Sequence, residues 1–351
     1  MYKKYLISIE HPAWIHQFKH IINSLIEDGN DVTILAINKD RSFELLDSFG
    51  FNYIRVANST GNNIIEKGIL FFWLCLLYSF YTYKYKTEVL IGRASPMMAV
   101  AAFLNRKKHI IFEDTEVSHF SLNICKLFSA KILTSTSFLN NLGKKQLKTN
   151  CYKELFYLHP KYFQPDKNIL IKHGFNPNEK YVIVRFISWN ASHDINCKGL
   201  NNKEQINFIK RLNEYYKVYI TSEKPLCNEL KQYLLDTPYE LIHHILSFAQ
   251  IYIGEGATMA SESAVLGTYA IYINDLISGS TKELEEKYEL MSCFQKNELK
   301  YELAIKKVKE LTLIENLKEE TIKKRDIMLS NKIDINEYYL KILLRGVGNV
   351  I

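Results

Sequence analysis

The sequence lacks the features that mark several common protein classes. Its six cysteines, at positions 75, 125, 151, 197, 227 and 293, are scattered, and no pair has the spacing of a zinc knuckle or a redox C-x-x-C motif. The first apolar run is short and is followed at once by Glu10 and His11, which is unlike a secretory signal. Scattered cysteines without such a signal are typical of a reducing compartment, so we expect a cytoplasmic protein.

The sequence also has no apolar run long enough to cross a bilayer. Its longest uncharged run, residues 68–83 ("GILFFWLCLLYSFYTY"), has sixteen residues where about twenty are needed. Two interpretations stay open for this run. It is either a buried helix packed on a sheet or a helix that docks on a membrane surface, because Trp73 and the tyrosines favour the interface and Lys84 and Lys86 can meet anionic headgroups. The second interpretation places the protein on the inner face of the cytoplasmic membrane.

The charge distribution and the absence of several motifs exclude some classes of ligand. The net charge is +7, but lysine and glutamate are intermixed and no arginine-rich tract is interleaved with aromatic residues, so we expect no nucleic-acid partner. There is no D-x-D metal motif and no Walker phosphate loop, and we expect neither a metal nor another cofactor. Mild basicity suits an anionic small substrate or an anionic membrane face.

Short apolar runs alternate with helical patterns along most of the chain. In the first half these runs are residues 5–9, 31–37, 52–56, 88–92, 109–113 and 131–136. The alternation predicts an α/β protein with two Rossmann-like, doubly wound domains facing a cleft. We place the first domain at residues 1–157, a linker with three prolines at 158–180, and the second domain at 181–325. We expect the remaining residues, 326–351, to form a helix.

One stretch, residues 252–273 ("YIGEGATMASESAVLGTYAIYI"), predicts a strand, a glycine turn, a short helix, a glycine stop and a second strand. The amino end of that helix offers N–H donors at Gly256, Ala257 and Thr258, where the helix dipole favours a diphosphate. The alternative is a simple helix cap. A dehydrogenase fingerprint is not supported, because no third glycine follows Gly254 and Gly256 at the required spacing.

Polar residues follow the other expected strands, where ligands of such sheets bind. Arg185 interrupts an apolar strand and suits phosphate oxygens, with a structural ion pair as the alternative. Arg93 is a candidate for sugar or acceptor binding, with a buried salt bridge as its alternative. The proton-transfer candidates of the first domain are His11, His16, Asp114, Glu116 and His119. The remaining strand-end candidates are His159 for the acceptor, and Ser188, Trp189, Asn190 and His193 for the nucleotide sugar.

These motifs together resemble a known family. "HPAWIHQF", "GRASP", "FEDTE", "YLHPKYF", "VRFISWNASHD" and "GEGATMASESAVLG" look like the motifs of domain of unknown function 354, an archaeal and bacterial family similar to glycosyltransferase-B enzymes and UDP-N-acetylglucosamine 2-epimerase. The resemblance covers residues 1 to about 275 in order. It implies an enzyme with a sugar nucleotide, expected to be UDP-linked, in the cleft between its domains. It also implies a C-terminal helix that crosses back to the first domain, and a carboxylate at Glu262 that accepts hydrogen bonds from the ribose hydroxyls.

Three functions follow from the resemblance as hypotheses. The first is a glycosyltransferase of cell-surface polysaccharide or glycolipid assembly, with His16, Asp114, Glu116 and His119 as catalytic candidates and a saccharide or lipid-linked acceptor. The second is a 2-epimerase-like enzyme without an acceptor, although "EDTEVSHF" and "RFISWNASHD" do not reproduce the epimerase motifs. The third is a non-catalytic nucleotide-sugar binding protein. The sequence does not indicate an oligomeric state.

Overall fold

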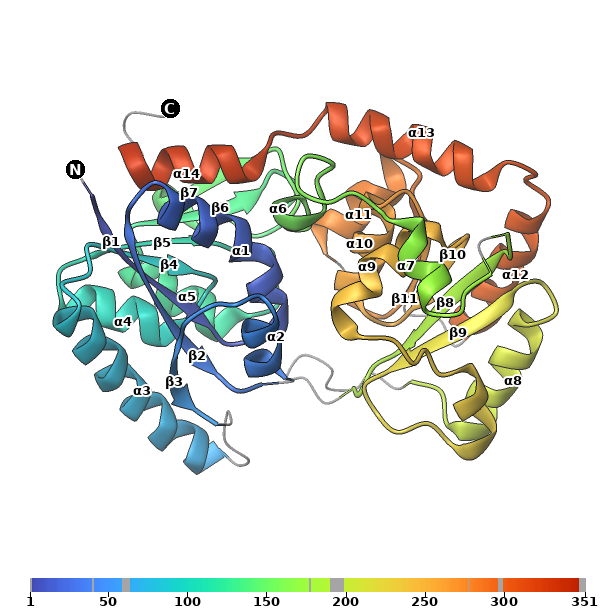
Figure 1. The fold of residues 1–351 in the computed structure, drawn as a ribbon, viewed down its shortest axis with the longest axis horizontal. Coiled ribbons are helices and arrows are strands. Elements are labelled where there is room, and N and C mark those ends of the chain that lie inside the picture. Colours follow the sequence, from blue (N-terminus) through green and yellow to red (C-terminus); the bar gives the residue numbers. More distant parts are fainter. Residues whose placement is uncertain are drawn as a thin grey trace. The chain divides into compact units, whose positions relative to one another are not determined.

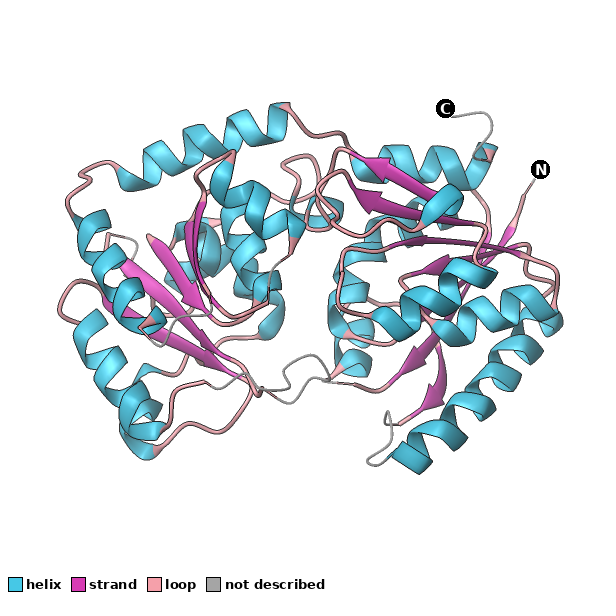
Figure 2. Cartoon of the chain, turned by 180° about the vertical axis from the view of Figure 1, so that it is seen from behind, coloured by secondary structure: helices cyan, strands magenta, loops and turns pink. Residues whose placement is uncertain are grey.

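The structure, a computed structural model, describes residues 2–39, 41–58, 64–176, 178–189, 199–276, 278–295 and 299–346. It consists of two α/β units (Figures 1 and 2). Unit 1 comprises residues 1–162 and 333–351, and unit 2 comprises residues 163–332. The division falls after Tyr162, within the expected linker of residues 158–180, and part of that linker forms helix α7 (Lys167–Lys172) of unit 2.

Unit 1 is built on a parallel sheet of seven strands in the order β3-β2-β1-β4-β5-β6-β7. The strands are β1 (Lys4–Ile9), β2 (Asp31–Ile37), β3 (Ile54–Ala57), β4 (Val89–Gly92), β5 (Lys108–Phe112), β6 (Lys131–Ser135) and β7 (Gln146–Thr149). The chain adds β2 and β3 on one side of β1 and then β4 on the other side. The reversal makes the gap between the carboxyl ends of β1 and β4 the place where such a sheet binds ligands.

Helices cover both faces of this sheet, and the alternation of β1 side chains shows which helix lies on which face. Leu6 packs in one cluster with Leu74 and Tyr78 of α3 (Ile64–Lys84), whereas the Tyr5 hydroxyl donates to the Leu343 carbonyl of α14 (Ile335–Arg345) at 3.3 Å. The helix α3 shares its face with α4 (Pro96–Leu104) and α5 (His119–Phe128). The helix α14 lies on the other face with α1 (Pro12–Glu27), α2 (Ser42–Ser48) and α6 (Leu155–Leu158). Unit 1 also contains the short helix η1 (Gly143–Lys145).

Local sequence explains how two of these helices start next to the binding edge. Proline at the first helical position is preorganised for a helix, and α1 and α4 begin at Pro12 and Pro96. The ring nitrogen Nδ1 of His11 accepts from the Ala13 amide at 3.2 Å, and the Ser95 hydroxyl accepts from the Met98 amide at 3.3 Å. Both caps satisfy amides that the helix itself leaves without partners.

Unit 2 has a parallel sheet of five strands in the order β12-β11-β10-β8-β9. The strands are β8 (Tyr181–Phe186), β9 (Lys217–Ser222), β10 (Ile251–Gly254), β11 (Tyr269–Ile273) and β12 (Met291–Phe294). Alternate residues of β8 again face opposite helix layers. Val182 and Val184 pack with α8 (Asn202–Leu212) and α12 (Lys300–Thr312), whereas the Tyr181 hydroxyl donates to the Ile245 carbonyl of α9 (Ile242–Phe248) at 2.6 Å. The gap between β8 and β10 is the reversal point of this sheet.

The remaining helices of unit 2 include α10, which forms the centre of the predicted glycine-rich motif. They are η2 (Asn228–Tyr233), η3 (Tyr239–Leu241), α10 (Ala257–Val265), α11 (Gly279–Glu286) and α13 (Leu317–Ser330). The motif folds as predicted, with β10, then α10 capped by Gly256, then β11. Gly267 ends the helix at φ +79°, a conformation that glycine adopts without strain. The alternation of strands and helices read from the sequence is therefore confirmed in both units.

Candidate functional site

The reversal point of the unit 2 sheet brings a cation to the amino end of a helix. Arg185, the fifth residue of β8, lies on the same face as α9 and α10. A Cβ atom added to Gly256, the N-cap of α10, would lie 4.0 Å from Arg185 Nε. The positive end of a helix dipole and a guanidinium repel each other unless an anion lies between them. The arrangement is therefore suited to a phosphate group.

The two glycines of this turn differ in what they do. A Cβ atom at Gly254 would lie 2.3 Å from the Tyr252 hydroxyl oxygen and 3.1 Å from Arg185 Cβ, so no larger residue fits there without moving its neighbours. At Gly256 the nearest atom is Ile187 Cγ2 at 3.5 Å, an ordinary contact. Gly254 is needed for packing beneath Arg185, whereas Gly256 keeps open the approach to the helix amides.

Arg185 also forms an ion pair, which was its alternative role. Its Nη2 atom lies 2.7 Å from Glu223 Oε1, and the second oxygen of Glu223 accepts from the Ser188 amide at 2.9 Å. Glu223 is partly exposed, with 39% of its side-chain surface accessible. The pair thus orients the guanidinium and the Ser188 backbone together. Solvent access to Glu223 leaves this ion pair weaker than a fully buried one.

A residue that sequence analysis did not select, Glu255, connects the loops of this edge. Its buried carboxylate accepts hydrogen bonds from the Ile187 amide at 2.9 Å, the Trp189 indole at 3.1 Å and the Tyr301 hydroxyl at 2.6 Å. Burial raises the pKa of Glu255, and these donors partly oppose the rise. A carboxylate between two glycines at a strand end was the available signal. Its partners lie in distant parts of the sequence, and this explains why the pattern alone did not reveal its role.

The loop after β8 contains several other candidates. Trp189 has φ +54°, and its ring lies beside Gly199, where an added Cβ would be 2.2 Å from the indole nitrogen. Lys300 Nζ lies 5.6 Å from the centroid of the Trp189 ring and 3.2 Å from Asp275 Oδ2. The candidates Asn190 and His193 lie outside the described residues.

Glu262 lies on α10 and is buried, with 7% of its surface exposed. Its Oε1 atom is 3.2 Å from Nε2 of His243 on α9, and the His243 ring makes an edge contact with Phe163. The carboxylate therefore sits in a partly apolar setting with a histidine that fixes one of its oxygens. An ionised carboxylate can accept hydrogen bonds from two hydroxyl groups at once, and the expected role of Glu262 at the ribose stays a prediction.

In unit 1 the candidates Arg93 and Asp114 belong to one buried charge cluster. The Arg93 guanidinium pairs with both Glu113 and Asp114, and Asp114 Oδ2 lies 2.8 Å from Lys153 Nζ. Glu113 also accepts from the Ala94 amide at 3.0 Å. Burial alone would raise the pKa of Asp114, but Arg93 and Lys153 outweigh it and lower the pKa below the usual value. Asp114 is held ionised and is a weak base, and Arg93 has the buried salt bridge that was its alternative role.

A second residue that sequence analysis did not select, Glu10, follows β1 at the reversal point of the unit 1 sheet. The Ser8 hydroxyl donates to Glu10 Oε1 at 2.7 Å and lies 2.9 Å from the Tyr78 hydroxyl. Burial raises the pKa of Glu10, and hydrogen bonds from Ser95 and Ser8 oppose the rise only in part. A carboxylate with a raised pKa is better matched to proton transfer near neutral pH than one with a lowered pKa.

The other candidates of unit 1 lie in different surroundings. His16 is buried on α1 between the rings of Phe49 and Tyr157, at centroid distances of 5.7 and 5.6 Å. His119 is exposed at the start of α5, and Glu116 is buried, its carbonyl accepting from Asn140. His11 caps α1, as described above.

His159 follows α6 and lies next to Tyr162 and Lys161, where its Nδ1 accepts from the Lys161 amide at 3.2 Å. Burial lowers the pKa of His159. These contacts are separate from those of the Arg93 cluster, and the expected role of His159 at the acceptor stays a prediction.

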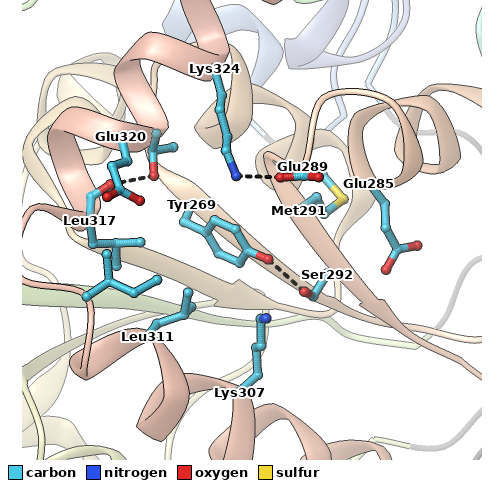
Figure 3. A pocket seen from close by; sticks show the side chains of 12 residues that line it. Tyr269, Glu285, Glu289, Met291, Ser292, Lys307, Leu311, Leu317, Glu320 and Lys324 are labelled. Atoms are coloured by element: carbon cyan, nitrogen blue, oxygen red, sulfur yellow. Dashed lines mark hydrogen bonds and ion pairs between the residues drawn. The ribbon is translucent and has the colours of Figure 1, made fainter.

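A hollow of about 330 Å³ in unit 2 lies away from these residues (Figure 3). Its walls include residues of α11, β11, β12, α12 and α13, at the opposite edge of the sheet from β9. Two pairs of its polar side chains contact each other, since the hydroxyls of Tyr269 and Ser292 lie 2.8 Å apart and Lys324 Nζ lies 2.6 Å from Glu289 Oε2 (Figure 3). Within the described ranges no group of three or more His, Cys, Asp or Glu residues is placed to hold a metal ion.

Two α/β units, each built on a parallel sheet of this topology, define the fold class of glycosyltransferase-B enzymes and their structural relatives. The fold is similar to UDP-GlcNAc 2-epimerase of Neisseria meningitidis bound to UDP-GlcNAc, with a TM-score of 0.71 and 11% identity over 97% of this chain and 100% of that one. It is also similar to S. aureus MnaA with UDP, with a TM-score of 0.69 and 12% identity over 99% and 98% of the two chains. A third similar structure is Acinetobacter baumannii MurG, with a TM-score of 0.62 and 14% identity over 98% and 99%.

Identities this low show the fold alone. No family model matches the sequence, and no curated protein matches it. The expected membership in domain of unknown function 354 therefore stays a prediction. The part of the resemblance that pointed to the glycosyltransferase-B fold is confirmed by the structural comparison.

Proposed function

We propose that the protein is a sugar-nucleotide-dependent glycosyltransferase of cell-surface polysaccharide or glycolipid assembly. The observation that carries the proposal is the arrangement at the unit 2 reversal point, where Arg185 lies beside the amino end of α10 beneath an open glycine. This is a site for a phosphate or diphosphate. A diphosphate is also the leaving group of a sugar nucleotide.

Unit 2 holds the nucleotide in this proposal. The amides of Gly256, Ala257 and Thr258 and the Arg185 guanidinium bind the diphosphate. The Glu262 carboxylate, oriented by His243, accepts the ribose hydroxyls. The neighbours bound to UDP or UDP-GlcNAc support a UDP-linked donor. Trp189 and Ser188 line the same strand end and are assigned to the nucleotide sugar as well.

Unit 1 supplies the base and the acceptor contacts. The base removes the proton from the acceptor hydroxyl as its oxygen bonds to the sugar carbon, while the bond from that carbon to the diphosphate oxygen breaks. Glu10 fits this role best, because its pKa is raised, whereas Asp114 is held between two cations. Asp114 and Arg93 then act by electrostatic orientation. The negative charge on the departing diphosphate is stabilised by donors already in place, so the step needs no metal ion.

A sugar-nucleotide epimerase is the second candidate, favoured by the structural likeness to UDP-GlcNAc 2-epimerases. The two activities differ in whether an acceptor is required. A transferase releases a nucleoside diphosphate only when an acceptor is added, whereas an epimerase converts the sugar nucleotide without one. A binding protein does neither.

The experiment begins with thermal unfolding against a panel of nucleoside diphosphates and nucleotide sugars, because a ligand that binds the folded state raises the Tm. The best ligand is then incubated with and without saccharide and lipid-linked acceptors, and free diphosphate and epimerised sugar are measured. We expect acceptor-dependent release of diphosphate. Epimerised product without an acceptor would establish the second candidate, and no stabilisation by any member of the panel would refute the diphosphate site.

A further inference from the structure

The uncharged segment identified in the sequence forms a helix that is apolar on two opposite sides. One side of α3 is buried against the sheet and α4, through Leu74, Cys75 and Tyr78. The other side carries large apolar residues exposed over more than half of their surface, namely Ile69, Phe72, Trp73, Leu76, Phe80 and Tyr83. At 100° per residue these six positions fall within one stripe along the helix. The helix therefore packs on the sheet with one side, as the first sequence interpretation expected, and also presents an exposed apolar stripe, while docking on a membrane stays a prediction.

The exposed stripe belongs to a wider apolar helix layer. On α4 and α5, which complete the same layer, Phe103, Leu104, Phe120 and Leu127 are each exposed over more than half of their surface. The ring of Phe71, on the side of α3 that packs against the buried cluster, lies 6.2 Å from the ring of Phe120 between centroids, which brings the start of α5 beside α3. Figure 1 shows α3 running along the outside of unit 1. We call the residues of the α3 stripe the apolar face.

Cations gather at one end of this layer. Helices of a parallel sheet all run opposite to the strands, so the carboxyl ends of α3, α4 and α5 lie along the same sheet edge. The exposed cations at or just after these ends are Lys84, Lys86, Arg106, Lys107, Lys108 and Lys126. Among the described residues, the exposed carboxylates of these three helices and of the segments that follow them are Glu66 and Glu88, and Asp31, at the start of β2 on the same sheet edge, is also exposed and pairs with Lys4 at 3.3 Å. Lys84 lies within 6 Å of the ring centroids of Phe80, Tyr81 and Tyr85, which joins the cations to the aromatic side chains.

We propose that the apolar face docks unit 1 onto the surface of an anionic lipid bilayer. Trp73 and Tyr83 are suited to the level of the headgroups, the aliphatic and phenylalanine side chains to the acyl boundary, and the lysines and arginines to lipid phosphates. The helix lies on the membrane and does not cross it. None of the helices within the described ranges is long and apolar enough to span a bilayer.

The charge pattern favours an anionic lipid surface over a second copy of the chain. A second copy that pairs through this layer supplies these cations with few anionic partners, because Glu66 and Glu88 are the exposed carboxylates among the described residues of the three helices and the segments that follow them. An anionic bilayer instead attracts the same cations while it covers the apolar side chains. The proposal is independent of the catalytic assignment, because it depends on no residue of the nucleotide or base sites.

Vesicle flotation tests the proposal with the full chain. We expect the protein to float with vesicles of equal phosphatidylglycerol and phosphatidylcholine at low salt, to float less at high salt, and to float poorly with phosphatidylcholine alone. The double substitution Phe72→Glu with Leu76→Glu should lower the apparent vesicle affinity at least tenfold. Lys84→Gln with Lys86→Gln should lower it by about fivefold for each lysine at low salt.

Matched control variants carry the same changes of net charge, but at exposed positions of unit 2. Leu313→Glu with Ile327→Glu replaces apolar residues of unit 2 that are 84% and 60% exposed, and Lys306→Gln with Lys309→Gln removes two exposed lysines of α12. Both controls should float like the wild type. Because the substituted side chains of α3 are exposed, near-ultraviolet circular dichroism should show the same folded core in all variants.

Trp73 provides a second measurement that does not depend on a disruptive change. Its fluorescence should shift to shorter wavelength on addition of anionic vesicles, and Trp73→Phe should float normally while losing most of that shift. Flotation that is absent at every ionic strength would overturn the proposal, as would flotation unaffected by Phe72→Glu with Leu76→Glu. Dimerisation of the wild type that the same substitutions abolish, without vesicle binding, would instead assign the face to a second copy.

Discussion

Replacement of Glu262 by alanine removes a carboxylate that is 93% buried and 3.2 Å from His243. If this carboxylate accepts the ribose hydroxyls, its loss removes hydrogen bonds to a charged group, worth about 1.5 to 3 kcal/mol. The dissociation constant for the nucleotide should therefore rise from about tenfold to more than a hundredfold. Glu262→Gln retains one acceptor oxygen and should fall between the wild type and the alanine variant.

The same substitution has a structural cost that must be measured first. In the alanine variant His243 loses its carboxylate partner inside a buried region, and we expect the free energy of unfolding to fall by about 1 to 3 kcal/mol. Glutamine preserves the volume and should cost less. Glu286→Ala is the matched control, because its side chain is 64% exposed on the surface of the same unit. It should change neither stability nor binding appreciably.

The decisive assay is titration calorimetry with two ligands, UDP and 2′,3′-dideoxy-UDP. The wild type should prefer the ribose compound strongly, because only it offers the two hydroxyls. Glu262→Ala should bind both compounds with similar affinity. A folded alanine variant that keeps the full preference would show that Glu262 is not the ribose ligand, and the assignment of α10 would then rest on the diphosphate contacts alone.

Three further predictions concern unit 1 and metal dependence. If Glu10 is the base, its ionised form is the active one, and kcat/KM should fall on the acid side of the pH profile with an apparent pKa above 4.5. Glu10→Gln should lower kcat/KM by about a hundredfold or more at every pH. A variant with an unchanged profile would exclude Glu10 as the base. Lys153→Met should cost about 3 to 5 kcal/mol in urea unfolding at neutral pH. The pKa of Asp114 is lowered from 3.8, so the stability that its ionised form contributes is present above pH 3.8 and is lost as the pH falls through the pKa of the folded state. The free energies of unfolding of the wild type and of Lys153→Met should therefore approach each other in acid. A difference that stays constant with pH would contradict this. EDTA should leave activity largely intact, and complete loss restored by one divalent ion would refute donor-only stabilisation of the diphosphate.

The fold was predictable wherever strands are buried on both faces. The runs that became β1, β2, β8 and β11 are apolar and long enough to stand out from the helices around them. The edge strands β7 and β12 were missed. Each has four residues, "QLKT" and "MSCF", and each pairs on one side only. Their conformation depends on a neighbouring strand already in place, which local sequence does not encode.

The candidate site was predictable where a local motif fixes the backbone, as in the turn from Gly254 to Thr258. Glu10 and Glu255 were missed because their significance comes from partners far away in the sequence, Ser95 for the first and Tyr301 for the second. The sequence left open whether the second side of α3 is exposed, for a related reason. An apolar helix looks the same in sequence whether one of its sides or both are covered.

The position of α14 has a consequence for synthesis of the chain. Its Tyr339 hydroxyl donates to the Ile110 carbonyl at 2.6 Å, and Asn336 donates to the Phe156 carbonyl at 2.7 Å, so the last described helix completes the core of unit 1. Unit 2 is thus inserted within unit 1 and is made entirely before α14 emerges from the ribosome. Domains usually fold in the order in which they are synthesised. Synthesis of unit 1 begins before that of unit 2, but unit 1 can complete its folding only after α14 has been made. Until then the surfaces of Phe18 and Phe156 that Tyr339 of α14 contacts remain accessible to chaperones.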